Sequence, residues 1–447
     1  MTSISSQARP PQSVEEALFL AALGTEAIPL LRYDPQRPTK LAIACIHALG
    51  MASRSPHNFE DFLQPLRAYE QDSRKAVQKA CQQMVRKLGG SRALLPKYLW
   101  QPYFIEGIEV NGATTLEWIR YLACWPSYGR SITLRNSSIA SLQQMTNLPD
   151  LEKLHLVNLP VDDLSPLATL QHLHTLTLGD LPLLEDLSPL ADFPQLTALT
   201  LGGHLPMVKD LSPLGKLQNL TTLHLNLHLH PDEHHCNDLS FLATLRGLRT
   251  LFIQGHPTSS LTLPSALTYL SLYLCPKLTD YAFLSALTNV TTLSLSSCAP
   301  IEDSTPLGNM TALSKLILRY TACRDCSPLA NLPNLVDVAL SRINEDMDLS
   351  PLAASRSLRR LSIESDDNAG MGNISVLGNS PSLRKLELVP RPFSSRNEHI
   401  DLTPLCQAPA LQYVNISAYK GERIKGVSEL QKRGVILNSR YTPDIYK

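Results

Sequence analysis

The sequence predicts an α/β solenoid preceded by a small all-helical domain. Within the solenoid region, leucines recur as L-x-x-L-x-L units that lie roughly 23 residues apart. Before residue 105 the apolar residues follow a helical spacing instead. Between the leucine units, the string Asp-Leu-Ser-Pro-Leu returns at 163–167, 186–190, 210–214 and 348–352, and as Asp-Leu-Thr-Pro-Leu at 401–405.

Each repeat unit has two halves with different physical roles. In the segment 173–178, Leu176 and Leu178 alternate with polar residues, as in a strand with one buried face. One such strand cannot bury its leucines alone, so neighbouring units must stack into a parallel sheet. In the other half, the aspartate can accept backbone N–H bonds and proline suits the first position of a short helix. We therefore expect a leucine-rich repeat with a parallel concave sheet and short helices on its convex side.

The pattern divides the chain into segments with different expected structures. Ser13 and Glu16 form a capping box, and Asp72 and Gly89 bound a clear amphipathic helix. A repeat array also needs a cap at each open end. We predict a disordered tail at 1–12, a helical N-terminal domain at 13–105, an N-terminal cap at 106–134, leucine-rich repeats at 135–420, and a C-terminal cap and tail at 421–447.

Composition excludes several classes of protein. The chain has 40 basic and 40 acidic residues, so no global field favours nucleic acid or an anionic membrane. Its nine cysteines are odd in number and irregularly spaced, unlike a disulfide framework. We see no convincing secretion signal and no run of ~18 apolar residues that could span a membrane. We expect a cytoplasmic protein with no membrane partner and no cofactor.

The repeats from about residue 130 to 420 resemble the short-repeat class of bacterial leucine-rich-repeat proteins, which includes the internalins. They also resemble the leucine-rich sensor arms of bacterial NACHT-type, NLR-related ATPases. The resemblance rests on the Asp-Leu-Ser-Pro-Leu string and, for the sensor arms, on the helical N-terminal region. It implies protein recognition, in the second case as a sensor in bacterial defence or signalling. The sequence has no G-x-x-x-x-G-K-[ST], so an ATPase in such a system would be a separate polypeptide.

Motifs that could carry chemistry have simpler interpretations. Cys323 and Asp325 match the C-x-D string of leucine-rich-repeat ubiquitin ligases, but Asp325 is the repeat's own aspartate and no catalytic domain follows. We therefore expect no enzymatic activity. A histidine-rich stretch has ligand types suited to zinc, but its spacing matches no established zinc pattern, so we expect a solvated loop. Its candidate ligands are His228, His230, His234, His235 and Cys236.

A further column of residues appears when the repeats are superposed. It lies three positions after the second strand leucine, and strand stacking should turn it into a ladder that satisfies buried turn backbone. Buried neutral histidines are the expected consequence. The column holds His204, His228, His256, Cys275 and Cys298.

The exposed strand positions predict where a partner binds. Most are small and neutral, but aromatic residues and arginines gather near the middle of the array, as at interface hot spots. The alternative is that these aromatics only pack on each other in an unliganded groove. The predicted binding residues are Phe252, Tyr269, Tyr273, Ile317, Arg319, Tyr320, Arg342 and Arg360.

The leading functional hypothesis is a non-enzymatic scaffold that binds a protein partner on the concave face. A second protein could dock on the N-terminal helices. One alternative is a regulatory subunit of a separate enzyme, such as an ATPase or a phosphatase. Another is nucleic-acid binding through the basic region 67–97. We favour a simpler interpretation of this region as the solvated side of an amphipathic helix, because no aromatic or glycine-rich recognition motif accompanies it.

Overall fold

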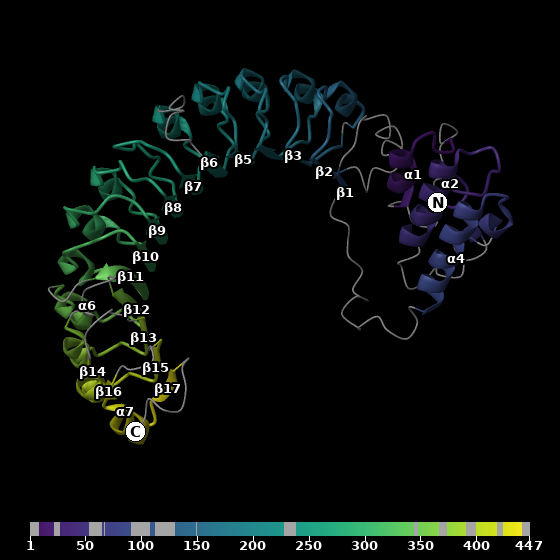
Figure 1. Cartoon of the computed structure of the whole chain (residues 1–447). Coiled ribbons are helices and arrows are strands. Elements are labelled where there is room, and N and C mark those ends of the chain that lie inside the picture. Colours follow the sequence, from purple (N-terminus) through teal and green to yellow (C-terminus); the bar gives the residue numbers. More distant parts are fainter. Residues whose placement is uncertain are drawn as a thin grey trace. The chain divides into compact units, whose positions relative to one another are not determined.

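Short helices open the chain and parallel strands follow them, as the computed structural model shows (Figure 1). The described residues divide into two units, 1–184 and 185–447, and we treat each unit separately. The structure describes residues 9–21, 27–52, 65–66, 68–90, 108–111, 130–148, 150–227, 238–343, 347–365, 373–389, 399–417 and 423–439.

The first unit begins with helices that pack around an apolar core. They are α1 (Val14–Leu20), α2 (Thr39–Ala52), the 3-10 helix η2 (Ala68–Gln71) and α4 (Lys75–Gly90). One half of the predicted capping box is present, because the Glu16 N–H donates to Ser13 Oγ over 3.1 Å. The Glu16 carboxylate accepts a bond from the Gln12 N–H over 2.6 Å. Helix α2 packs against both α1 and α4. A Cβ at Gly50 would collide with the side chain of Met84, so glycine at that position permits the close approach of α2 and α4.

Parallel strands complete the first unit. Strands β1 (Ile108–Asn111), β2 (Ser131–Arg135), β3 (Lys153–Val157) and β4 (Thr175–Gly179) pair in sequence order. The 3-10 helices η5 (Gln143–Asn147) and η6 (Ser165–Thr169) follow β2 and β3.

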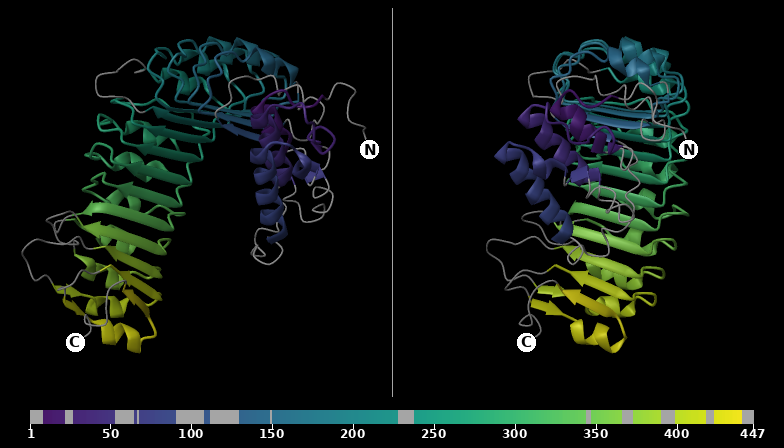
Figure 2. Two further views of the ribbon diagram at one scale, coloured as in Figure 1. Left: turned by 45° about the vertical axis from the view of Figure 1, so that its right-hand side comes forward. Right: turned by 90° about the vertical axis from the view of Figure 1, so that its right-hand side faces the viewer.

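The second unit repeats the same strand and short-helix alternation. Its strands lie side by side in sequence order (Figure 2). They line the inner side of the curved unit, and the short helices line its outer side (Figure 1). The main sheet contains β5 (Ala198–Gly203), β6 (Thr222–Leu227), β7 (Thr250–Gln254), β8 (Tyr269–Tyr273), β9 (Thr292–Ser296), β10 (Lys315–Arg319), β11 (Asp337–Ile343), β12 (Arg360–Ser365), β13 (Lys385–Val389), β15 (Tyr413–Ile416) and β17 (Ile436–Ser439).

Helices and one small sheet form the outer part of this unit. Strands β14 (His399–Asp401) and β16 (Arg423–Lys425) pair only with each other. The helices are η7 (Ser188–Asp192), η8 (Ser212–Lys216), η9 (Ser240–Thr244), η10 (Ala282–Ala286), η11 (Thr305–Asn309), η12 (Ser327–Leu329), α6 (Ser350–Ala354), η13 (Ile374–Asn379), η14 (Thr403–Gln407) and α7 (Val427–Lys432).

Register explains why leucines hold the sheet together. Leu293 pairs with Leu316 and Leu295 pairs with Leu318, and all four side chains are fully or almost fully buried. Ser294, which lies between two of them on β9, is half-buried on the opposite face. The leucines therefore stack in columns behind the sheet, and the intervening residues form its inner surface. The predicted α/β solenoid with a leucine-rich-repeat core and parallel concave sheet is confirmed.

The turn aspartates act as the sequence predicts. In the second repeat string the Ser188 N–H donates to Asp186 Oδ1 over 2.7 Å, and the Ser188 hydroxyl donates to Oδ2 over 2.6 Å. The same bond from backbone to aspartate recurs at Asp163, Asp210 and Asp348. The helices that follow are mostly 3-10 helices, whose tighter turn suits a segment of only five residues.

Several expectations about domain organisation remain predictions. The division between the units, after Leu184, falls inside the repeat array. This division does not test the predicted boundaries of the helical domain, the two caps and the repeats. Residues 106–107 and 112–129 of the expected N-terminal cap at 106–134 lie outside the described residues, as do residues 1–8 of the expected tail. Within the described ranges, every helix is too short or too polar to cross a bilayer.

Candidate protein-binding face

An aromatic cluster occupies the inner surface of the second unit at β6, β7 and β8. The rings of His224 and Phe252 meet edge to face with centroids 4.2 Å apart, and the rings of Phe252 and Tyr269 are 4.8 Å apart. All three side chains are half-buried. Burial lowers the pKa of His224, so its ring is neutral at pH 7. The cluster combines an apolar surface with polar tips, which is typical of interface hot spots.

Four other predicted binding residues also lie on strands of this surface. Tyr273 is the last residue of β8 and its side chain is 42% exposed. Ile317 on β10 is half-buried between two buried leucines, and Arg319 at the end of that strand is exposed. Arg360 begins β12 and is exposed as well. Together with Phe252 and Tyr269 of the aromatic cluster, these residues form what we call the strand-face patch: Phe252, Tyr269, Tyr273, Ile317, Arg319 and Arg360.

Tyr320 and Arg342 are placed differently from the sequence expectation. Tyr320 is the first residue beyond β10 and has φ 53°, and Arg342 has φ 60° where the pairing of β11 with β12 shifts register. A left-handed residue ends the alternation of inward and outward side chains, so these two do not continue the strand face. With Ser297 and Cys298 they line a shallow hollow of about 360 Å³. It lies at the sheet edge that the C-terminal ends of β9, β10 and β11 form.

The left-handed position recurs along the array and was not recognised from the sequence. In earlier repeats it holds residues that tolerate positive φ, such as Asn158 at 55°, Asp180 at 51° and Gly255 at 73°. Four successive repeats then carry other residues there. They are Leu274, Ser297, Tyr320 and Arg342. The recurrence of Asn, Asp and Gly at this position in the earlier repeats is a sequence signal that predicts a left-handed turn.

Charged residues gather on the inner surface at β10 to β13, and the lysines among them are paired. Lys315 Nζ lies 3.4 Å from Asp337 Oδ2, and Lys385 Nζ lies 2.7 Å from Glu387 Oε1. Lys385 also lies over the ring of Tyr413, 5.2 Å from its centroid. Within the described part of the chain the arginines of this region, in contrast, make no ion pair. They are Arg319, Arg342 and Arg360.

The expected ladder is present over part of the array. His256, Cys275 and Cys298 are buried, and the next repeat adds Thr321, which the sequence analysis did not include. His256 Nδ1 accepts a hydrogen bond from the Thr258 N–H over 3.1 Å, and Thr321 Oγ1 accepts one from the Cys298 N–H over 3.0 Å. These bonds satisfy turn backbone, as the structural interpretation requires.

The ladder does not extend through every repeat in which it was expected. His204 is exposed, so the expectation of burial is wrong there. His228 lies outside the described residues, together with the other metal candidates His230, His234, His235 and Cys236. In the part of the chain that the structure describes, no group of His, Cys, Asp and Glu side chains could hold a metal ion.

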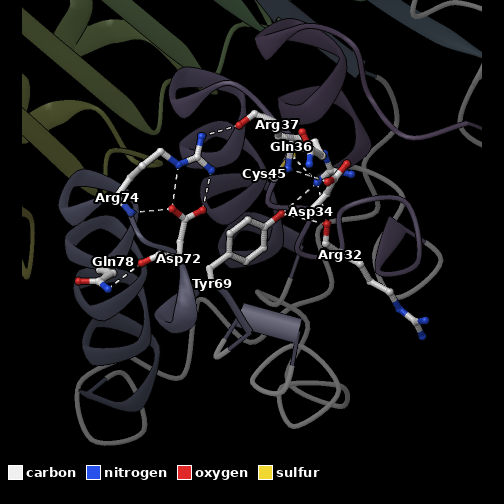
Figure 3. Close-up of polar contacts among 9 residues, drawn as sticks. All are labelled: Arg32, Asp34, Gln36, Arg37, Cys45, Tyr69, Asp72, Arg74 and Gln78. Carbon is white, nitrogen blue, oxygen red and sulfur yellow. Dashed lines mark hydrogen bonds and ion pairs between the residues drawn. The ribbon is translucent and has the colours of Figure 1, made fainter.

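A buried polar network holds the N-terminal helices together (Figure 3). The Arg37 side chain is only 6% exposed, and it donates to the carbonyls of Leu30 and Arg32 and to the Tyr69 hydroxyl over 2.7 to 3.0 Å. The Tyr69 hydroxyl in turn donates to the Leu31 carbonyl over 2.6 Å. Burial raises the pKa of both Tyr69 and Cys45. This network is structural, because its polar groups satisfy each other.

The same region contains the basic stretch proposed for nucleic acid. Arg74 forms a bidentate ion pair with Asp72, with Nη2 lying 2.5 Å from Oδ2, and it also bonds to the Arg37 carbonyl (Figure 3). Its charge is therefore neutralised. Lys75 and Lys79 are exposed on α4. Arg67, Arg92 and Lys97 lie outside the described residues, so the nucleic-acid alternative stays a prediction.

The fold and its face define a leucine-rich-repeat solenoid, and the chain resembles bacterial leucine-rich-repeat proteins. No family model and no curated protein matches it. Among solved structures it is similar to an internalin of Listeria monocytogenes at 20% identity, over 87% of this chain and 98% of that one, with a TM-score of 0.48. A leucine-rich-repeat protein of Leptospira interrogans is 18% identical over 73% and 93% of the two chains, with a TM-score of 0.42. Internalin C2 of Listeria monocytogenes is 25% identical over 53% and 80%, with a TM-score of 0.26. These likenesses concern the fold and identify no partner.

Proposed function

We propose that this protein is a non-enzymatic recognition scaffold whose second unit binds a protein partner on the strand-face patch. The aromatic cluster of His224, Phe252 and Tyr269 is the observation that carries the proposal. Its rings lie on the open side of the sheet, where the leucine core does not need them. Most neighbouring positions, such as Ser271 and Ser294, are small and leave the rings accessible from the inner side.

The mixed composition of the patch supports a protein partner over a small molecule. Exposed Tyr273 and Arg319 lie on strands β8 and β10, so the surface extends across several repeats and is not concentrated in one enclosed cavity. Tyrosine and arginine contribute most of the binding energy at many protein interfaces. The packing of Phe252 on Tyr269 also preorganises the surface, which lowers the entropy lost on binding.

The proposal includes the setting in which the scaffold works. We place it in the cytoplasm of a bacterium, as a sensor in an NLR-like defence or signalling system, with a second protein on the N-terminal helices. Free thiols support a reducing compartment, since every cysteine among the described residues is unpaired. If the partner is an ATPase or a phosphatase, the scaffold is its regulatory subunit, and the enzyme would copurify in fixed stoichiometry.

The test compares full-length variants in partner capture and binding. Replacing Phe252, Tyr273 and Arg319 together by Ala should weaken binding of the captured protein by at least about a hundredfold. A matched variant replaces Leu183, Met207 and Arg324, exposed residues that lie outside the strands, by Ala. It should bind as the natural chain does. Equal binding by both variants would show that the strand-face patch is not the binding surface.

A further inference from the structure

The hollow at the sheet edge is built by three successive left-handed turns. Ser297 follows β9, Tyr320 follows β10, and Arg342 lies at the end of β11, with φ of 54°, 53° and 60°. Backbone bonds fix the first of these turns, because the Ser297 N–H donates to the Arg319 carbonyl over 2.7 Å. A repeating turn thus holds a hydroxyl, a phenol and a guanidinium next to one another on a rigid edge.

Tyr320 and Arg342 are unfavourable residue types for a backbone conformation with positive φ. Asparagine and glycine adopt positive φ at little cost, whereas tyrosine and arginine do not. Tyr320 is 38% exposed and Arg342 is exposed, so burial in the core does not compensate for their conformation. Strained residues that persist on a surface are typical of binding sites.

The guanidinium of Arg342 has the chemistry to bind an anion. Its Cζ lies over the Tyr320 ring, 5.7 Å from the ring centroid. The fork of N–H groups on a guanidinium matches two oxygens of a carboxylate or phosphate. Arg342 makes no ion pair within the described ranges.

Two charged residues lie close to the hollow among the described residues. Arg319, which precedes Tyr320, is exposed and adds a second positive charge to this edge. The acid in the adjacent strand, Glu364, is half-buried and accepts a hydrogen bond from the Ser341 hydroxyl over 2.7 Å. The Cys298 thiol also lines the hollow, and it donates to the Leu272 carbonyl over 3.5 Å.

We propose that this hollow binds an oxyanion, either a carboxylate or a phosphoryl group, that the protein partner carries. Arg342 holds two of its oxygens, the Ser297 hydroxyl donates a further bond, and Tyr320 keeps the guanidinium in place. This proposal depends on the proposed function only in assigning the anion to a protein partner. Binding of the anion itself can be measured without any partner.

The experiment titrates the full-length protein with inorganic phosphate and, separately, with acetate at constant ionic strength. The readout is the NMR shift of the backbone amides of Ser297 and Tyr320. We expect saturable shifts with at least one anion, and Arg342→Gln should weaken that binding by at least about tenfold. Arg356→Gln removes the same charge from an exposed residue that lies outside the strands and outside the strand-face patch, and it should change the affinity by less than about twofold.

A second variant separates the site from a general charge effect. Tyr320→Asn suits the left-handed turn but removes the ring under the guanidinium, so it should weaken anion binding while the protein stays folded. Saturation by phosphate alone supports a phosphoryl group, and saturation by acetate supports a carboxylate. The proposal would be overturned if neither anion gave saturable shifts, or if Arg342→Gln and Arg356→Gln lost the same affinity. The titration contains no protein partner. Its result therefore stays valid even if the strand-face patch proves not to bind a protein.

Discussion

Replacing Arg37 by Met should open the N-terminal helices without disturbing the repeats. The methionine has a similar length but donates no hydrogen bond. It leaves the Leu30 carbonyl without the donor it has now and leaves the Arg32 carbonyl with only the 3.2 Å bond from Tyr69. Arg37 is 6% exposed, so water cannot simply replace the guanidinium.

The expected magnitude follows from opposing terms. An unsatisfied buried acceptor costs about 1–3 kcal/mol. Removing a buried charge relieves part of its desolvation cost, which lowers the net effect. We expect the free energy of local unfolding to fall by about 2 kcal/mol. Tyr69→Phe removes the donor to the Leu31 carbonyl and should cost about 1 kcal/mol. The double variant should lose less than the sum, because the two side chains bond to each other.

Hydrogen exchange of the α2 amides in the full-length protein is the appropriate assay. It reports opening of this region separately from unfolding of the repeats. Arg32→Met is the matched control, because Arg32 is exposed and its side chain is not part of the network (Figure 3). It should change protection by less than about 0.5 kcal/mol. If Arg37→Met exchanges no faster than the control, the carbonyls find other donors and the network does not stabilise the helices.

Three further outcomes test the repeats, all in the second unit. Leu295→Ala should lower the free energy of unfolding in urea by about 2–5 kcal/mol, whereas Ser294→Ala on the opposite face should change it by less than about 0.5 kcal/mol. Hydrogen bonds from Ser188 lower the pKa of Asp186 below its ordinary 3.8, so its contribution is present above pH 3.8 and is lost as the pH falls through the lower folded value. The melting-temperature difference between the natural chain and Asp186→Ala should therefore shrink between pH 7 and pH 2. Tyr320→Asn should raise the free energy of unfolding in urea by about 1 kcal/mol, because asparagine suits positive φ, and Tyr320→Ala should give no such gain.

The sheet could be predicted from sequence because its signal is short-range and repeated. Leu293 and Leu295 alternate with small polar residues over a few positions, and a similar alternation returns in most units. The turn aspartates were equally predictable, since Asp186 and Ser188 are two residues apart and their bond is local. Residues on the strands, such as Phe252 and Tyr273, therefore lie on the expected face.

The network around Arg37 could not be predicted in this way. Arg37 and Tyr69 are 32 residues apart, and no periodicity connects them. Their contact depends on how α2 packs, partly through the close approach at Gly50. Tyr320 and Arg342 were misplaced for a different reason. The sign of φ at a strand end decides whether the next side chain continues the face, and a tyrosine or arginine carries no local signal for a positive φ.

The left-handed turns connect the fold to its proposed function. A turn that served only the fold would be most stable with asparagine or glycine, as at Asn158 and Gly255. Tyr320 and Arg342 each cost roughly 1 kcal/mol or more at the same position. The core cannot offset this cost, because neither side chain is buried. The interaction of Arg342 with the Tyr320 ring contributes about 0.5–1 kcal/mol, as such contacts do at exposed sites. The oxyanion site that we propose would give these two residues a role beyond the turn, next to the strand face on which we propose that a protein binds.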